Sequence, residues 1–332
     1  MQSMKTTLLI VVFLCTQSLI VAGAEKPSGL PVAKITVQTV DEQAKPVAGV
    51  PIHFVFMNPI TYQPLSIDGF SDEGGFFSAE GGSDSTIAGE IRKAGYYRGG
   101  FPLEPFVKSK EGHWQPWNQT NVVLMRKIEN PIPMYAKNFF LKVPQIGKPC
   151  GYDLAVGDWM SPWGKGRVPD FVFTMTCDYT NFNHQNTSMK LTFSNPLDGI
   201  QPADLPKEFA YGEFIWHRQS PESGYVGSYE QELGLPRKLF QIPSAPKVRS
   251  GEDIEAQKFY FRVRTVEKEG KVVSALYGKL SRGFGMGATN PTNINVGTCY
   301  YLNPTPLDRN MEFDLKQNLF KNLKVEEQPR KP

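Results

Sequence analysis

The residues of this chain that could bind or transform a ligand are concentrated between Tyr152 and Asp170. Aromatic faces can stack on the C–H groups of sugars, and carboxylates can accept hydrogen bonds from sugar hydroxyls. The stretch therefore predicts a carbohydrate-binding surface on which Trp159 and Trp163 supply the rings and Asp158 a polar partner. The aromatic and charged side chains of the stretch are Tyr152, Asp153, Asp158, Trp159, Trp163, Lys165 and Asp170.

The same stretch allows three other interpretations. Its oxygen-rich side chains could hold calcium, which takes six to eight oxygen ligands. Trp159 and Trp163 could instead fill the core of a loop-rich domain, which is the commoner fate of aromatic residues. An enzyme acting on glycans could use Asp153, Asp158 and Asp170 for acid–base chemistry, if two carboxylates lie about 5–10 Å apart across a cleft. Sequence does not supply that distance.

A second aromatic patch lies between Gly99 and Gln119, where Trp114 and Trp117 accompany His113. Tryptophans exposed on a loop would indicate recognition of a ligand. The alternative is that this segment forms a lid over a neighbouring sheet. Both tryptophans are candidate ligand-binding residues.

Sequence motifs for catalysis or cofactor binding are missing. The chain has only four histidines, no G-x-S-x-G elbow and no H-E-x-x-H pair, so no catalytic residue, metal site or cofactor is predicted. Gly283–Gly287 is glycine-rich, but 288–293 is a poor helix start for a dinucleotide-binding loop. We interpret it as a surface loop between strands.

The N-terminus has the three parts of a secretory signal peptide. Lys5 precedes the apolar run Leu8–Cys15, and Ala22-Gly23-Ala24 provides a small-residue cleavage site. A membrane-spanning helix would need about 20 apolar residues. We therefore expect residues 1–24 to be removed, leaving a secreted or periplasmic chain without a membrane span.

Composition indicates a packed globular protein, with 40% hydrophobic and 21% charged residues. The net charge of +3 is too small to predict a nucleic-acid partner. Removal of residues 1–24 would leave Cys150, Cys177 and Cys299. A bridge between Cys177 and Cys299 and buried free thiols are both compatible with these positions.

Short alternating strands separated by Gly, Pro and Asp clusters predict an all-β fold. One hairpin is expected from Lys258–Val266 and Lys271–Leu280, where Phe259, Phe261 and Val263 would share an apolar face. The other predicted strands include Lys34–Gln38, His53–Phe56, Asn121–Lys127, Phe171–Asp178, Met189–Phe193 and Thr298–Leu302.

Three segments of the first half resemble transthyretin-like, or carboxypeptidase-regulatory-like, modules. They are the turn and strand Lys45–Ile52, the turn Ser71–Phe77 and the strand Ala94–Tyr97. In the second of these, glycine accepts positive φ, aspartate caps its own backbone and an aromatic ring enters the core. The resemblance implies a transthyretin-like β-sandwich over residues 25–128, a fold found in accessory or structural parts of many exported proteins.

Residues 129–133 contain Pro131 and Pro133 and are predicted to be a stiff linker. A second β-rich domain is expected over 134–325, and the charged, proline-containing residues 326–332 predict a loose tail. Residues 130–137 and 300–314 resemble parts of exported bacterial proteins that pair a transthyretin-like module with a C-terminal β domain.

Together these features predict a secreted, non-enzymatic binding or structural protein whose partner is a polysaccharide or a cell-envelope component. A glycan-active hydrolase using carboxylates of the second domain is the enzymatic alternative. An architectural or adhesion component of the envelope is the third, favoured if both tryptophan patches are buried.

Overall fold

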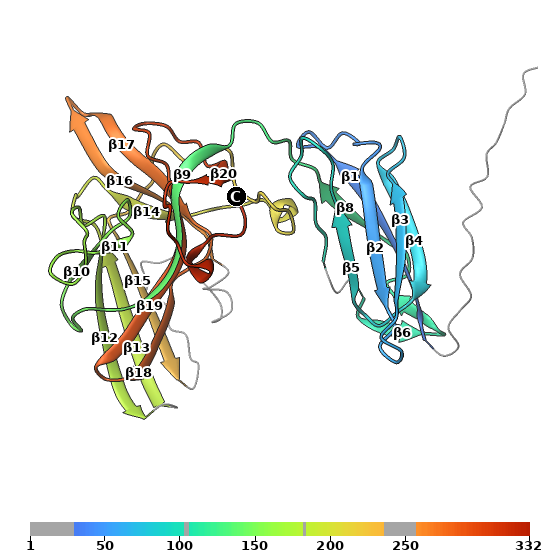
Figure 1. Cartoon of the computed structure of the whole chain (residues 1–332), viewed down its shortest axis with the longest axis horizontal. Coiled ribbons are helices and arrows are strands. Elements are labelled where there is room, and N and C mark those ends of the chain that lie inside the picture. Colours follow the sequence, from blue (N-terminus) through green and yellow to red (C-terminus); the bar gives the residue numbers. More distant parts are fainter. Residues whose placement is uncertain (1–29, 103–105, 182–183, 236–256) are drawn as a thin grey trace, which may run out of the picture.

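The computed structural model describes residues 30–102, 106–181, 184–235 and 257–332. Strands and two short 3₁₀ turns are the only regular elements among these residues, so the predicted all-β fold is confirmed. Figure 1 shows the strands gathered in two lobes, the first blue to teal and the second green to red. The expected signal peptide, residues 1–24, lies outside the described residues. No helix in the described ranges is long and apolar enough to cross a membrane.

The first lobe contains two sheets whose apolar faces enclose one core. Alternation in β1 (Val32–Val40) places Ile35 and Val37 inside, where they meet Phe54 and Phe56 of β2 (Pro51–Met57). One sheet has the order β3 (Pro64–Phe70), β2 (Pro51–Met57), β5 (Ile87–Ile91). The other has the order β4 (Phe76–Gly82), β1 (Val32–Val40), β7 (His113–Gln115), β6 (Lys108–Lys110), with β8 (Gln119–Leu124) parallel to β1.

The turn before β4 is built as its residue types predict. Asp72 accepts hydrogen bonds from the backbone N–H groups of Gly74 and Phe76 through Oδ1. Gly75 has φ +80°, and a Cβ there would lie 2.4 Å from the carbonyl oxygen of Thr39. Phe77 then packs on the core, whereas Phe76 remains on the outer face.

The second lobe also contains two sheets packed around a large aromatic core. Phe171, Phe173 and Phe261 are fully buried between them. One sheet has the order β11 (Asp158–Trp159), β10 (Cys150–Asp153), β12 (Phe171–Asn181), β13 (His184–Thr192), β15 (Ser228–Leu235). The other has the order β14 (Gly199–Pro202), β16 (Phe259–Lys268), β17 (Lys271–Leu280), β19 (Asn293–Leu302), β9 (Ile132–Lys142), β20 (Phe313–Asn318), with β18 (Gly285–Asn290) paired to β19.

Three sequence-based expectations differ from the structure. The glycine-rich segment expected as a surface loop supplies β18, because Gly285 and Gly287 pair with β19. The last two residues of the expected linker already belong to β9. The tail folds back after η2 (Val325–Glu327), since the Tyr301 hydroxyl donates to the carbonyl of Lys331. Each segment makes hydrogen bonds with residues distant in the sequence, which its local pattern does not reveal.

The two lobes are fastened by contacts between residues near Arg126 and the segment that follows η1 (Lys207–Phe209). Arg126 donates from Nη1 to the carbonyls of Phe214 and Trp216 at 3.1 and 2.5 Å. Its guanidinium also binds Glu42 of the first lobe. Because Arg126 is buried, these bonds tie the second lobe directly to the first lobe's interior.

Candidate functional site

Tyr152 and Trp159 lie in the core of the second lobe. The two residues face each other across β10 and β11, with 0% and 5% of their surface exposed. The Tyr152 ring stacks on Phe139 at 4.7 Å, and the Trp159 ring packs edge-on against Phe173 at 5.9 Å. Their faces are therefore occupied by other rings of the protein, so Trp159 and Trp163 do not form one exposed surface.

Asp153 and Asp170 are buried and converge on Arg264 of β16. Nε and Nη2 of Arg264 bind the two oxygens of Asp170 at 2.8 Å, and Nη2 also binds Asp153 Oδ1 at 2.9 Å. The remaining acceptor positions receive backbone N–H groups, including Leu154 to Asp170 and Val168 to Asp153. These contacts give both carboxylates a structural role.

The two carboxylates respond differently to burial. Burial by itself raises the pKa of Asp153, but the N–H donors of Arg167 and Val168 and the charge of Arg264 bring it below its ordinary value. For Asp170 burial prevails over Arg264, so its pKa is raised. Asp153 accepts hydrogen bonds from four backbone N–H groups and Asp170 from one, so the effect of burial on the pKa is offset at Asp153 and not at Asp170.

Asp158 organises the loop that follows β11. Its Oδ1 accepts the N–H of Trp159 at 2.8 Å, and its Oδ2 accepts the N–H of Lys165 at 2.9 Å. A Cβ at Gly164 would lie 2.3 Å from the Trp159 carbonyl oxygen, so only glycine fits beneath the loop. Both Asp158 oxygens are thus used to hold backbone in place.

Trp163 is the exposed residue of this segment, with 45% of its surface accessible. Its loop is fixed by Asp158 and by the N–H of Gly166, which donates to the Trp159 carbonyl at 2.8 Å. Lys165 and Arg167 are exposed on the same loop. In the described part of the chain no cluster of three or more His, Cys, Asp or Glu residues is arranged to hold a metal.

The three cysteines 150, 177 and 299 are free thiols. Cys150 and Cys299 are buried, and Cys177 is half-buried. Burial raises the pKa of the Cys150 and Cys299 thiols, which keeps them protonated and unreactive. The sequence was compatible with a Cys177–Cys299 disulfide or with free thiols, and the structure shows free thiols.

Trp114 forms part of a lid over the first lobe. Its ring stacks with Phe106, at 6.3 Å between centroids, against the core. Its Nε1 donates to the carbonyl of Ser83 at 2.8 Å. Trp114 therefore anchors the insert and leaves Trp117 as the exposed ring.

Trp117 lies at one end of the outer face of the sheet formed by β4, β1 and β8. It is 38% exposed and packs edge-on against His113 at 4.6 Å. The ammonium of Lys34, an outward residue of β1, lies 5.9 Å from the ring centroid. This contact places the Trp117 ring beside Lys34 on the outer face of β1.

Hydroxyl and amide groups follow along this face. Thr36 Oγ1 lies 2.7 Å from Ser78 Oγ and also donates to Asn118 Oδ1 at 2.7 Å. Thr120 stands opposite Thr36 on β8. A polar strip therefore crosses all three strands next to Trp117.

Exposed apolar side chains close the other end of the strip. Phe76 and Val122 flank Gln38 on the neighbouring strands and are 41% and 57% exposed. Lys34 and Gln38 are four residues apart, which corresponds to about 13 Å along the strand. Alternation along β4 is the sequence signal that Phe76 faces outward. The residues beside it on this face, Gln38 and Val122, lie on two strands that are distant in the sequence.

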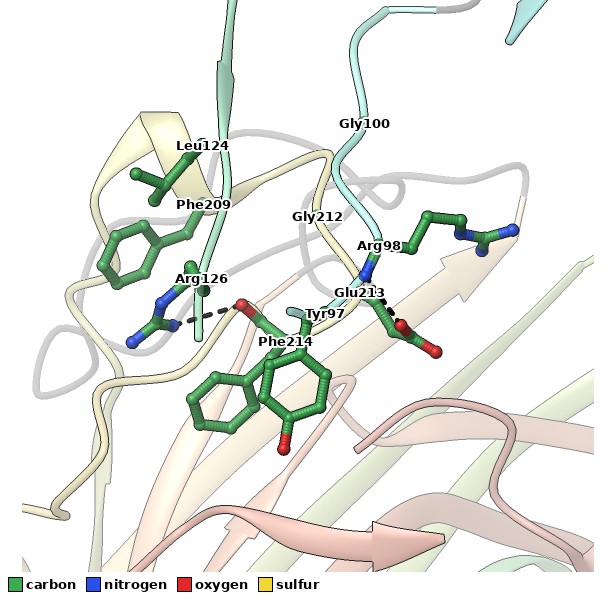
Figure 2. A pocket seen from close by; sticks show the side chains of 9 residues that line it. All are labelled: Tyr97, Arg98, Gly100, Leu124, Arg126, Phe209, Gly212, Glu213 and Phe214. Carbon is green, nitrogen blue, oxygen red and sulfur yellow. Dashed lines mark hydrogen bonds between the residues drawn. The ribbon is translucent and has the colours of Figure 1, made fainter. Parts of the chain in front are cut away.

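The hollow around Arg126 and Phe214 at the lobe junction is too small for a ligand. Figure 2 shows Tyr97 and Arg126 of the first lobe facing Phe214, while the Arg98 side chain points away. The hollow measures about 10 Å³, roughly the space of one water molecule. The backbone N–H of Arg98 donates to Glu213 Oε2 at 2.9 Å. This region is a packed joint between the lobes.

No family model and no curated protein matches the chain. Among solved structures, it is similar to 3-chlorocatechol 1,2-dioxygenase from Rhodococcus opacus 1CP, with 12% identity and a TM-score of 0.25 over 31% of this chain and 63% of that one. A hydroxyquinol 1,2-dioxygenase from Pseudomonas putida DLL-E4 is covered over 59% of its length, so the chain spans less than two thirds of either enzyme.

Two further structures match more of their own length. A DUF3823 family protein from Parabacteroides merdae matches at 12% identity and TM-score 0.19, over 81% of this chain and 98% of that one. The shaft pilin of Lactobacillus rhamnosus GG matches at 12% identity and TM-score 0.21, over 52% and 91%. At such TM-scores these likenesses carry no argument about function.

Proposed function

We propose that this protein is an exported, non-enzymatic polysaccharide-binding protein whose binding surface is the outer face of β4, β1 and β8. The observation that carries the proposal is the row of hydroxyl and amide groups between two exposed aromatic rings, Trp117 and Phe76. The proposal keeps the transthyretin-like character of residues 25–128 and export through residues 1–24.

The chemistry of this face suits an extended sugar chain. The apolar C–H face of a sugar ring can stack on Trp117, and a second ring of the same chain can stack on Phe76. Between them, Ser78 and Thr120 are exposed hydroxyl groups that can donate and accept hydrogen bonds. A flat face of this kind favours a linear polymer over a small compact ligand.

The contacts of the second-lobe carboxylates favour a non-enzymatic protein over a hydrolase. A general acid or nucleophile must be free to reach its substrate. Asp153 and Asp170 instead hold Arg264, and Asp158 holds the loop before Lys165. The proposal therefore assigns these three residues to stability.

The test is affinity electrophoresis of residues 25–332 through gels containing different polysaccharides. We expect at least one polysaccharide to retard the protein, and Trp117→Ala to weaken that retardation about tenfold, equivalent to 1.4 kcal/mol. Trp163→Ala is the matched control, because it removes an exposed tryptophan from the other lobe. Retardation that survives Trp117→Ala unchanged would contradict this site. The absence of retardation in every gel would instead favour an architectural role in the envelope.

A further inference from the structure

Phe140 of β9 is an exposed ring that is nevertheless held firmly. It is 56% exposed and lies in the part of β9 that pairs with β19, six residues beyond Met134, where the pairing of β9 with β20 ends. It pairs with Gly297 of β19, which pairs in turn with Gly285 of β18. Residues paired in this way point to the same face of a sheet, so the ring stands beside two positions without side chains.

The glycines form a floor for the ring. Positions for a Cβ at Gly285 and Gly287 lie 3.9 and 3.8 Å from Phe140 ring atoms, and at Gly297 the distance is 2.7 Å. The ring therefore lies across bare backbone of two neighbouring strands, with its opposite face toward solvent. A ring held like this loses little conformational entropy when a ligand stacks on it.

Cationic and amide groups surround Phe140 on the same face. Lys142, two residues along β9, is exposed and stands opposite Asn295. On the other side Arg282 donates from Nη2 to Asn138 Oδ1 at 2.8 Å. The strand positions that share this face around Phe140, at 138, 142, 285, 287, 295 and 297, carry no acidic residue.

We infer that Phe140 is the centre of a second carbohydrate site, which takes sugars bearing carboxylate groups. A sugar ring stacks on the open face of Phe140, and Lys142 faces the carboxylate. The isolated ring among polar groups does not fit a protein partner, which would need a larger apolar patch. Nucleic acid would need a more extensive basic surface than these two cations supply. The inference rests on the proposed function for the class of ligand, but it uses a different lobe and different residues.

The test compares retardation of residues 25–332 in gels of alginate, which is a polyuronate, and of an uncharged polysaccharide. We expect alginate retardation to weaken about tenfold in Phe140→Ala and Phe140→Leu. Phe140→Leu keeps an apolar cover on the glycines but lacks the aromatic face, so it separates binding from folding. Lys142→Gln should weaken alginate retardation and make it less sensitive to salt. Circular dichroism confirms that each variant is folded.

Trp117→Ala makes the two proposals separable. Alginate retardation lost in the Phe140 variants and kept in Trp117→Ala supports this second site, even if the first-lobe site fails. Alginate retardation that is absent, or unaffected in folded Phe140→Leu, overturns the inference. The first-lobe site is then judged separately, from the effect of Trp117→Ala on retardation by the other polysaccharides. Retardation by single-stranded DNA that depends on Phe140, without any by alginate, also overturns it.

Discussion

At the scale of residues, the carboxylates that first suggested chemistry have a mechanical role. Arg264 has φ +57°, a conformation that non-glycine residues seldom adopt, and its N–H is held by Asp198 Oδ2 at 2.9 Å. The irregular backbone directs the guanidinium to Asp153 and Asp170, which lie about a hundred residues earlier in the chain. The three side chains connect the two sheets of the second lobe.

Arg264→Ala should destabilise the protein by about 3–5 kcal/mol, because it leaves two buried carboxylates without their cation. Urea unfolding followed by tryptophan fluorescence measures the change. Lys268→Ala, at an exposed position of the same strand, is the control and should change stability by less than about 0.5 kcal/mol. A loss below about 1 kcal/mol for Arg264→Ala would show that the ion cluster is dispensable.

At the scale of elements, β19 and β9 approach closely because Gly297 of β19 has no side chain. A Cβ at Gly297 would lie 2.3 Å from the Phe139 carbonyl oxygen and 2.8 Å from Phe140 Cα. Both atoms belong to the backbone of β9, which cannot move without breaking its pairing with β19. The glycine at 297 is therefore required by the approach of two strands.

Gly297→Ala should lower stability by about 1–3 kcal/mol through overpacking. Thermal unfolding measures the loss as a lowered Tm. Gly227→Ala is the matched control, since a Cβ there would have its nearest neighbour at 4.0 Å. Equal Tm values for the two variants would mean that the β9 backbone can move away from position 297 at little cost in stability.

At the scale of the whole molecule, charged groups join the lobes. Glu42 lies between Arg126 of its own lobe and Arg218 of the other, at 2.8 and 2.7 Å. Arg218 also contacts Glu312 at 3.3 Å, and Glu312 accepts the Tyr97 hydroxyl at 2.9 Å. This network crosses the joint several times, so the lobes should behave as one body at neutral pH.

Acid should loosen this joint. Burial raises the pKa of Glu42, but hydrogen bonds and charges of Arg218 and Arg126 bring it below its ordinary 4.5. A lowered folded-state pKa gives stability that is present above 4.5 and lost as pH falls through the folded value. Small-angle scattering at about pH 7 and about pH 3 should show a larger radius of gyration in acid. In Glu42→Gln the difference should be smaller, and an unchanged wild-type radius would contradict the role of Glu42.

Asp170 and Asp198 have raised pKa values, so their contribution to stability changes with pH in the direction opposite to that of Glu42. Burial is the main cause for both, and it favours the protonated form in the folded state. The free-energy cost of burying these two carboxylates therefore decreases as the pH falls through their folded-state pKa values. The acid responses of Asp170 and Asp198 thus oppose that of Glu42, whereas Asp153, whose pKa is lowered, responds to acid in the same direction as Glu42.

The sequence by itself determined the strands and turns whose signals are local. Alternation fixed the inward residues of β1 and β16, and the Asp72–Gly75 turn follows from a capping carboxylate and a glycine with positive φ. Residue type also identified Trp117 as a candidate, but only the structure separated it from the anchoring Trp114.

Tertiary structure alone decided which candidate rings face solvent. Trp159 is buried because it pairs with Tyr152 in a two-residue strand, whereas Trp163 lies in the turn after Met160 and is exposed. The side on which such a short strand places its residues depends on pairing, which a local pattern does not encode. The roles of Arg264 and Phe140 depend in the same way on partners more than ninety residues away. Contacts between such distant residues are set by the packing of whole sheets.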